Sequence, residues 1–232
     1  LPDRTRVPVA GAVGASLTLA GDFATPMLDA RLTADGLVSA QFPDLPAASL
    51  KIAATSDAAR RLVINARLDQ KDIEPVELAL NMPFSPRGWF DDPATLRDLP
   101  LAGSVRMANL QIQRYAALVP GAKDISGTFH VAVDIAGTIA APDFRGRASI
   151  DNARIVPRKS NLATLDKTNL TVEFIGSKAR VTRGEARFGE GTLTLSGGLD
   201  FSNTAEPGID LQLKGDHILI WRDDDLLVRA SP

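Results

Sequence analysis

Several residue types are scarce in this chain of 232 residues. It contains no cysteine and only two histidines, and aromatic residues make up 5% of it. Without cysteine there are no disulfides, thiolate metal sites or cysteine nucleophiles, which is compatible with an oxidising compartment. Because 44% of the residues are hydrophobic and so few are aromatic, the apolar residues are chiefly Leu, Ala, Val and Ile. A surface built from them is aliphatic and lacks ring-stacking pockets.

Long runs of one residue class are also missing. Lys and Arg number 26 against 28 Asp and Glu, and no concentrated basic run supplies the face that a nucleic-acid partner needs. No stretch approaches the roughly 18 consecutive apolar residues of a membrane-spanning helix, and no signal-peptide pattern is visible. The chain starts abruptly at Leu1 and stops after a strand-like run at Pro232, so we expect a fragment of a longer protein.

Apolar and polar residues alternate in one segment after another. Successive side chains of a strand point to opposite faces, so this period of two predicts strands with one apolar and one solvated face. Parallel strands covered by helices would instead show continuous apolar runs, which favours an antiparallel sheet. The apolar positions that define the expected face are Leu17, Leu19, Leu62, Ile64, Val131, Val133, Ile135, Val172, Phe174, Leu193, Leu195, Leu211 and Leu213.

Glycine and Asx residues punctuate these segments at short intervals and predict turns. With them the chain divides into about 12 to 14 strands. The turns are expected at Ala34–Gly36, Asp151–Asn152, Gly189–Gly191, Asn203–Thr204, Lys214–Asp216 and Asp223–Asp225.

Two stretches lack the period of two. Residues 83–100 hold four prolines, which cannot donate to a β ladder, so a long crossing loop is expected there. Residues 156–167 form a second irregular stretch, and residues 114–118 could form one helical turn. Trp89, with Phe84 and Phe90, either plugs one end of the apolar face or docks a partner.

An internal repeat, residues 11–37 and 127–155, appears when the chain is shifted by 116 residues. Seven identities coincide, among them Gly21 with Gly137, Pro26 with Pro142 and Asp35 with Asp151. Repetition of this kind predicts a single elongated domain over residues 1–232 that is built of repeated strand modules. Sheets of more than about 10 strands rarely stay flat and open, so the apolar face must close as a sandwich or barrel, or curl into a trough.

Catalytic and ligand-binding constellations are missing from the pattern. His130 and His217 each sit on or beside the polar side of an alternating strand, and Asp223–Asp225 lacks the alternate spacing of a calcium loop. No nucleophile elbow, phosphate loop or paired-histidine motif occurs. We therefore expect a non-catalytic protein without cofactor or metal.

The run from Gly127 to Pro142 (GTFHVAVDIAGTIAAP) and the run Phe144–Ile155 (FRGRASIDNARI) carry a family resemblance. Together they resemble the recurring "strand, G-T-hydrophobic-A-A-P, strand, D-N/D-G" module of TamB-type proteins, which belong to the AsmA-like group of the Gram-negative envelope. Pieces 189–198, 207–215 and 226–232 follow the family pattern in the same order.

The resemblance implies a specific fold and setting. TamB-like domains form a long, curled, mostly antiparallel sheet, the β-taco, which is an open hydrophobic trough. The parent protein is anchored in the inner membrane, spans the periplasm and meets an outer-membrane barrel protein of the TamA/BamA type. It supports phospholipid transport and outer-membrane protein assembly. The thirteen apolar positions would then line a groove for phospholipid or other apolar cargo, and the edges of the sheet would pair with neighbouring β modules of the same chain.

Other functions stay open at this point. A structural β-sandwich or adhesin-like module would close the apolar face on itself and form no groove. A carbohydrate-binding or β-helical enzyme would need acidic or aromatic residues lined up along one solvent-exposed face, and the scattered aromatics argue against it.

Overall fold

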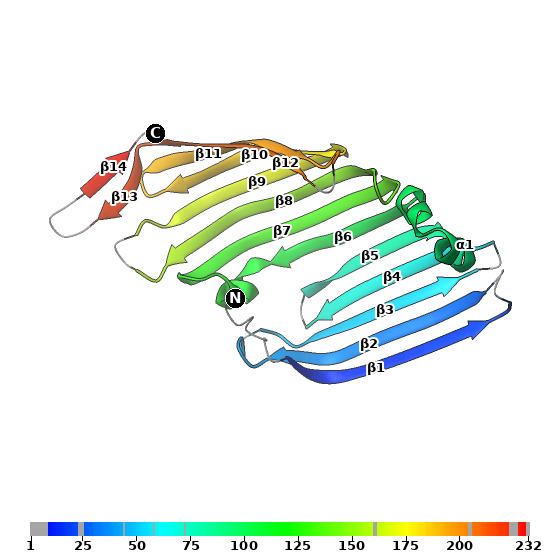
Figure 1. Ribbon diagram of the computed structural model, residues 1–232. Coiled ribbons are helices and arrows are strands. Elements are labelled where there is room, and N and C mark those ends of the chain that lie inside the picture. Colours follow the sequence, from blue (N-terminus) through cyan, green and yellow to red (C-terminus); the bar gives the residue numbers. More distant parts are fainter. Residues whose placement is uncertain are drawn as a thin grey trace, which may run out of the picture.

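In the computed structural model a single large sheet dominates the chain (Figure 1). The structure describes residues 9–22, 26–43, 45–57, 59–71, 73–159, 162–203, 206–222 and 227–230. The strands of the sheet are β1 (Val9–Ala20), β2 (Met27–Ser39), β3 (Ala48–Ser56), β4 (Arg61–Gln70), β5 (Ile73–Pro83), β6 (Ala102–Gln111), β7 (Ala122–Gly137), β8 (Pro142–Pro157), β9 (Leu165–Gly176), β10 (Lys178–Phe188), β11 (Gly191–Asp200) and β12 (Gly208–Asp216).

The twelve strands lie in the sheet in their order along the chain, and every neighbouring pair is antiparallel. A separate hairpin follows, formed by β13 (Ile218–Arg222) and β14 (Leu227–Ala230). The expected all-β, antiparallel architecture and the expected number of strands are confirmed. The large sheet is open, since β1 and β12 each have one partner strand among the described residues. It therefore differs from the sandwich with a closed core that was the alternative.

The register of the sheet aligns apolar residues from strand to strand. Antiparallel partners that lie opposite each other point to the same face, so one row can be followed across all twelve strands. The row through Val133 holds only apolar residues and glycine: Ala15, Leu32, Ile52, Ala66, Leu78, Val105, Val133, Gly146, Phe174, Ala179, Leu199 and Ile209. We call the side of the sheet that carries this row the apolar face.

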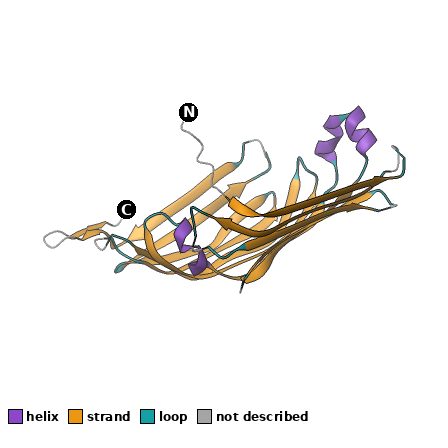
Figure 2. Cartoon of the chain, turned by 90° about the horizontal axis from the view of Figure 1, so that it is seen from below, coloured by secondary structure: helices purple, strands orange, loops and turns teal. Residues whose placement is uncertain are grey.

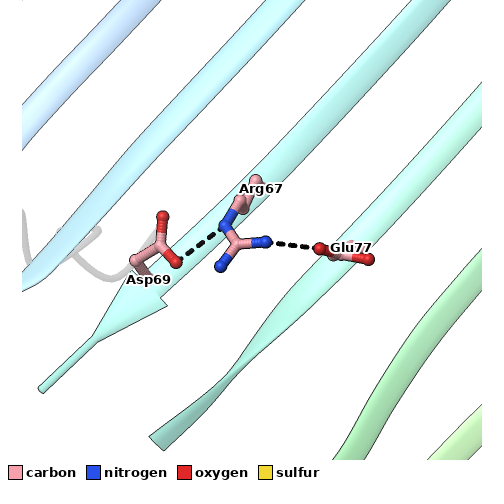
Figure 3. Close-up of polar contacts among 3 residues, drawn as sticks. All are labelled: Arg67, Asp69 and Glu77. Carbon is pink, nitrogen blue, oxygen red and sulfur yellow. Dashed lines mark hydrogen bonds and ion pairs between the residues drawn. The ribbon is translucent and has the colours of Figure 1, made fainter.

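The opposite side carries charged side chains and is called the polar face. Figure 3 shows Arg67 of β4 between Asp69 of the same strand and Glu77 of β5; Arg67 Nε lies 2.8 Å from Asp69 Oδ1. Further along, Arg147 of β8 pairs with Glu173 of β9 at 2.8 Å. These pairs are exposed, so each contributes at most about 1 kcal/mol, but together they keep this face solvated.

Two of the expected turns are β-bulges inside long strands. Asp35–Gly36 lies within β2 and Asp151–Asn152 within β8, and the register shifts at both places. Gly36 and Asn152 have φ values of +63° and +50°. Residues that tolerate positive φ suit bulges as well as turns, which is why the turn prediction was wrong here.

The remaining turn predictions have mixed outcomes. Gly189–Gly191 does connect β10 to β11. Lys214–Asp216 remains in β12, and the chain bends one residue later at His217, whose φ is +51°. Asp223–Asp225 and Thr204 lie outside the described residues.

The irregular stretches are shorter than expected. Residues 83–100 form the helix α1 (Pro86–Asp91) and the 3₁₀ helix η1 (Pro93–Asp98) in place of a loop without structure. Proline disfavours strands, but it is also favoured in the first turn of a helix. The prediction of a loop considered only the first of these two effects. The expected helical turn before Pro120 is present as η2 (Ile112–Leu118). Residues 156–157 and 165–167 belong to strands, leaving a short connection between β8 and β9.

Close backbone contacts accompany the bending of the sheet, which Figure 2 shows from below. Gly146 of β8 has a φ of +146°, and a Cβ atom placed on it would lie 2.1 Å from the carbonyl oxygen of Ala132 on β7. Glycine in a strand interior marks a close approach of this kind and is a device for curving a sheet. Gly103 of β6 makes a similar close approach: a Cβ atom placed on it would lie 2.4 Å from the carbonyl oxygen of Ala79.

An open apolar face as the candidate functional site

All thirteen apolar positions singled out from the sequence lie on the apolar face. The register places Leu17 in one row with Ile64 and Ile135. It places Val133 opposite Gly146 and hence in one row with Phe174. The positions from β11 and β12 join them, since β10 to β12 continue the same rows. The sequence pattern therefore selected a real surface that spans six strands.

Side chains on this face differ greatly in exposure. Val133 is 7% exposed and Leu62 is 8% exposed, whereas Leu17 is 66% and Leu213 is 65% exposed. No large side chain in the described part of the chain is fully buried. Apolar area left in water is unfavourable by about 25 cal/mol per Å², so a face of this kind is costly unless something covers it.

Sequence reasoning missed several side chains of the same face. Ile52 and Val105 lie in the row of Val133, and the alternation in residues 48–56 and 102–107 could have found them. Phe144 packs edge to face on Phe174 and on Phe201, with ring centroids 6.5 Å and 6.1 Å apart. No local signal marks that cluster, because β8, β9 and the end of β11 bring the rings together.

An aromatic pair stands where β5 leads into α1. Phe84, which is 7% exposed, packs against Trp89 of α1 with ring centroids 5.5 Å apart. Phe90 is 80% exposed and takes no part. Two of the three aromatics therefore pack together and the third faces solvent.

The polar side chains of the described residues are exposed or half-buried. Among the described residues there is no buried polar or charged side chain and no group of acidic and histidine residues suited to a metal ion. His130 is half-buried; its Nδ1 accepts the backbone N–H of Asn109 at 3.2 Å, and its Nε2 lies 3.8 Å from Asp151 Oδ2. It therefore supports a bulge in β6 and is less solvated than expected.

The pKa values of Tyr115 and Asp57 are shifted by their surroundings. Burial raises the pKa of Tyr115, whose hydroxyl donates to Gln70 Oε1 where η2 meets the end of β4. The pKa of Asp57 is lowered by hydrogen bonds from the backbone N–H and the guanidinium of Arg61. Both groups hold elements together.

No helix of the described residues has the length and apolarity that crossing a bilayer requires. No family model, curated protein or solved structure matches the chain.

Proposed function

We propose that this chain is a non-catalytic segment of a TamB-like, envelope-spanning protein, and that its apolar face carries phospholipid acyl chains between membranes. The observation that carries the proposal is the row of apolar residues and glycine that crosses twelve strands without interruption. A fold that needed this face only for its core would cover it. Here Leu17, Leu213 and Ile209 remain 66%, 65% and 70% exposed on the two terminal strands.

The shape of the sheet supports a trough. A side chain in the middle of a flat single layer keeps its outer side in water, yet Val133 is 7% exposed. Such burial favours a sheet that curls toward its apolar face. The close backbone contact at Gly146 fits this direction, since glycine on the inner side of a curved sheet permits the bend.

The size and chemistry of the face suit acyl chains. Twelve strands about 4.8 Å apart extend for about 50 Å. Methylene chains need continuous aliphatic contact and no hydrogen-bond partners, and Leu, Val, Ile, Ala and glycine provide that contact. The resemblance of residues 127–155 to TamB modules adds the setting: the periplasm, an inner-membrane anchor elsewhere in the parent chain, and an outer-membrane barrel protein as partner.

A lipid-capture experiment tests the proposal. The purified chain is mixed with vesicles that contain a fluorescent phospholipid, separated by size exclusion and examined by native mass spectrometry. We expect bound phospholipid on the unmodified chain. Leu17→Glu and Leu213→Glu should lower the bound amount several-fold, because a carboxylate on the apolar face is costly beside acyl chains.

Matched controls come from the adjacent polar-face positions. Ser16→Glu and Gln212→Glu introduce the same charge on the same strands but on the other side of the sheet, and should leave lipid capture unchanged. Absence of lipid on the unmodified chain, or equal loss in both pairs of variants, would overturn the proposal.

A further inference from the structure

The two ends of the central strands differ in charge. At one end β7 begins at Ala122, β8 ends at Pro157, β9 begins at Leu165 and β10 ends at Phe188. Ala122 is opposite Pro157, and Leu165 is opposite both Ile155 and Phe188. These four strand ends therefore lie side by side along one rim of the sheet.

Three exposed cations gather at this rim: Lys123, Arg158 and Lys159. We call them the basic corner. Arg158 is held against β7, since its backbone N–H donates to Gly121 O at 2.8 Å and its Nε donates to Ala122 O at 2.9 Å. Within the described part of the chain, neither Lys123 nor Lys159 belongs to an ion pair.

Nearby acids do not neutralise the corner. Asp124 follows Lys123 directly and offsets one of the three cations. Asp166 of β9 lies 4.0 Å from Arg154 and accepts the backbone N–H of Lys167, so it already has partners. Glu190, in the turn that follows β10 at the same rim, also has an interaction partner already. With only Asp124 to offset them, the three cations leave the corner an excess of positive charge.

A row of apolar residues crosses the four central strands next to the basic corner. Ile125, Ile155, Leu165 and Phe188 form a row across β7 to β10, and Ile125 is 4% exposed. Lys123 is two residues beyond Ile125, which corresponds to about 7 Å along a strand. An amphiphile whose chains lie on the apolar face would place its headgroup beside these cations.

The opposite rim of the same strands has a different character. The turn between β7 and β8, residues 138–141, is uncharged, and Ile139 in it is 44% exposed. Lys178 pairs with Asp200 at 3.4 Å, and Arg87 of α1 pairs with Asp91 at 3.6 Å. Both cations are already matched by carboxylates of the protein. Arg97 of η1, whose backbone oxygen accepts the N–H of Ala140, also lies at this rim and is followed directly by Asp98.

From this contrast we propose that the basic corner binds the phosphate of an anionic amphiphile, so that lipids with net negative headgroups are preferred over zwitterionic ones. The inference rests on the proposed function, because it assumes that the acyl chains occupy the apolar face. Phosphate carries charge that pairs well with ammonium and guanidinium groups, whereas a choline headgroup brings its own cation.

Binding of short-chain lipids below their micelle concentration tests the inference without a membrane surface. Dihexanoyl phosphatidylglycerol should bind on the order of fivefold more tightly than dihexanoyl phosphatidylcholine in calorimetry, as a few exposed charge pairs would give. The preference should shrink in high salt. Lys123→Gln with Lys159→Gln should abolish it. Lys178→Gln, which removes a cation already paired with Asp200 at the opposite rim, should leave it unchanged.

The outcomes separate the two proposals. If neither lipid binds, the proposed function fails and the inference fails with it. If both bind equally well, or if the Lys178 variant loses the preference as much as the corner variant, only the inference is overturned. Inorganic phosphate is the third probe. If phosphate binds the corner at least as tightly as dihexanoyl phosphatidylglycerol at matched ionic strength, the corner is a site for free phosphate and the lipid assignment is wrong.

Discussion

The central and terminal strands both place apolar residues on the apolar face but bury them to very different degrees. On β7, Val133 is 7% exposed; on β1, Val13 and Leu17 are 68% and 66% exposed, and on β12, Ile209 is 70% exposed. A central strand has a neighbour on each side. A terminal strand has one neighbour, so half of its lateral contact is missing.

Because of this difference, the apolar residues of the central and terminal strands contribute unequally to the stability of the fold. Apolar residues of the central strands contribute to the free energy of folding because they leave water when the sheet forms. Those of β1 and β12 contribute little, since most of their surface stays wet. The alternation nevertheless continues over residues 16–19 of β1 and along β12, which fits a face whose role extends beyond folding.

Substitutions at two glycines should show the largest contrast. Gly146→Ala places a Cβ atom 2.1 Å from Ala132 O at a φ of +146°, whereas Gly14→Ala on β1 meets only the flexible Thr33 Oγ1 at 3.0 Å. We expect a loss of about 2 to 4 kcal/mol in the free energy of unfolding for Gly146→Ala. Gly14→Ala should change it by less than about 0.5 kcal/mol. Urea unfolding measures both, and equal losses would contradict the curvature assigned to the centre.

A smaller contrast is expected for truncated aliphatic side chains. Val133→Ala should lower the free energy of unfolding by about 2 kcal/mol, because it leaves a gap among packed neighbours. Leu17→Ala, at 66% exposure, should cost about 0.5 kcal/mol although it removes more atoms. Urea unfolding of both variants measures these losses. A larger loss of unfolding free energy for Leu17→Ala than for Val133→Ala would mean that the terminal strand is covered in solution.

The uncharged edge of β1 should affect association more than stability. The strand VAGAVGASLTLA has no charged residue or proline, whereas β12 carries Asp210 and Lys214. An exposed edge without such residues pairs readily with other strands. Ser16→Lys should therefore reduce concentration-dependent association in sedimentation velocity, with little change in the unfolding midpoint. Gln212→Lys on β12 is the control, and an equal effect there would remove the distinction between the edges.

The smallest effect concerns a charged turn. Hydrogen bonds from Arg61 lower the pKa of Asp57 below its ordinary value of 3.8, so the folded state favours the ionised form. Its stabilisation is present above that ordinary pKa and is lost as the pH falls through the lowered one. Asp57→Asn should lower the thermal midpoint slightly at pH 7 and not at about pH 2. A difference that persists in acid would assign the effect to shape instead of charge.

Sequence reasoning was accurate where the period of two was long and uninterrupted. The alternation in residues 131–135, 170–174 and 209–213 identified strands and the face of each apolar residue. It failed where one residue type serves two conformations: Asp151–Asn152 reads equally as a turn or a bulge, and the prolines of residues 83–100 begin helices as readily as they prevent strands. The contact of Phe144 with Phe201 could not be predicted, because no local pattern links residues so far apart.

The sequence by itself determined that one face of the sheet is apolar, since alternation along a strand sends side chains to fixed sides. It also placed the thirteen residues of that face, Val133 and Leu17 among them. Only the tertiary structure decided how deeply each is buried and that the sheet stays open. Those properties depend on strand order, register and close contacts such as the one at Gly146, which join residues distant in the chain.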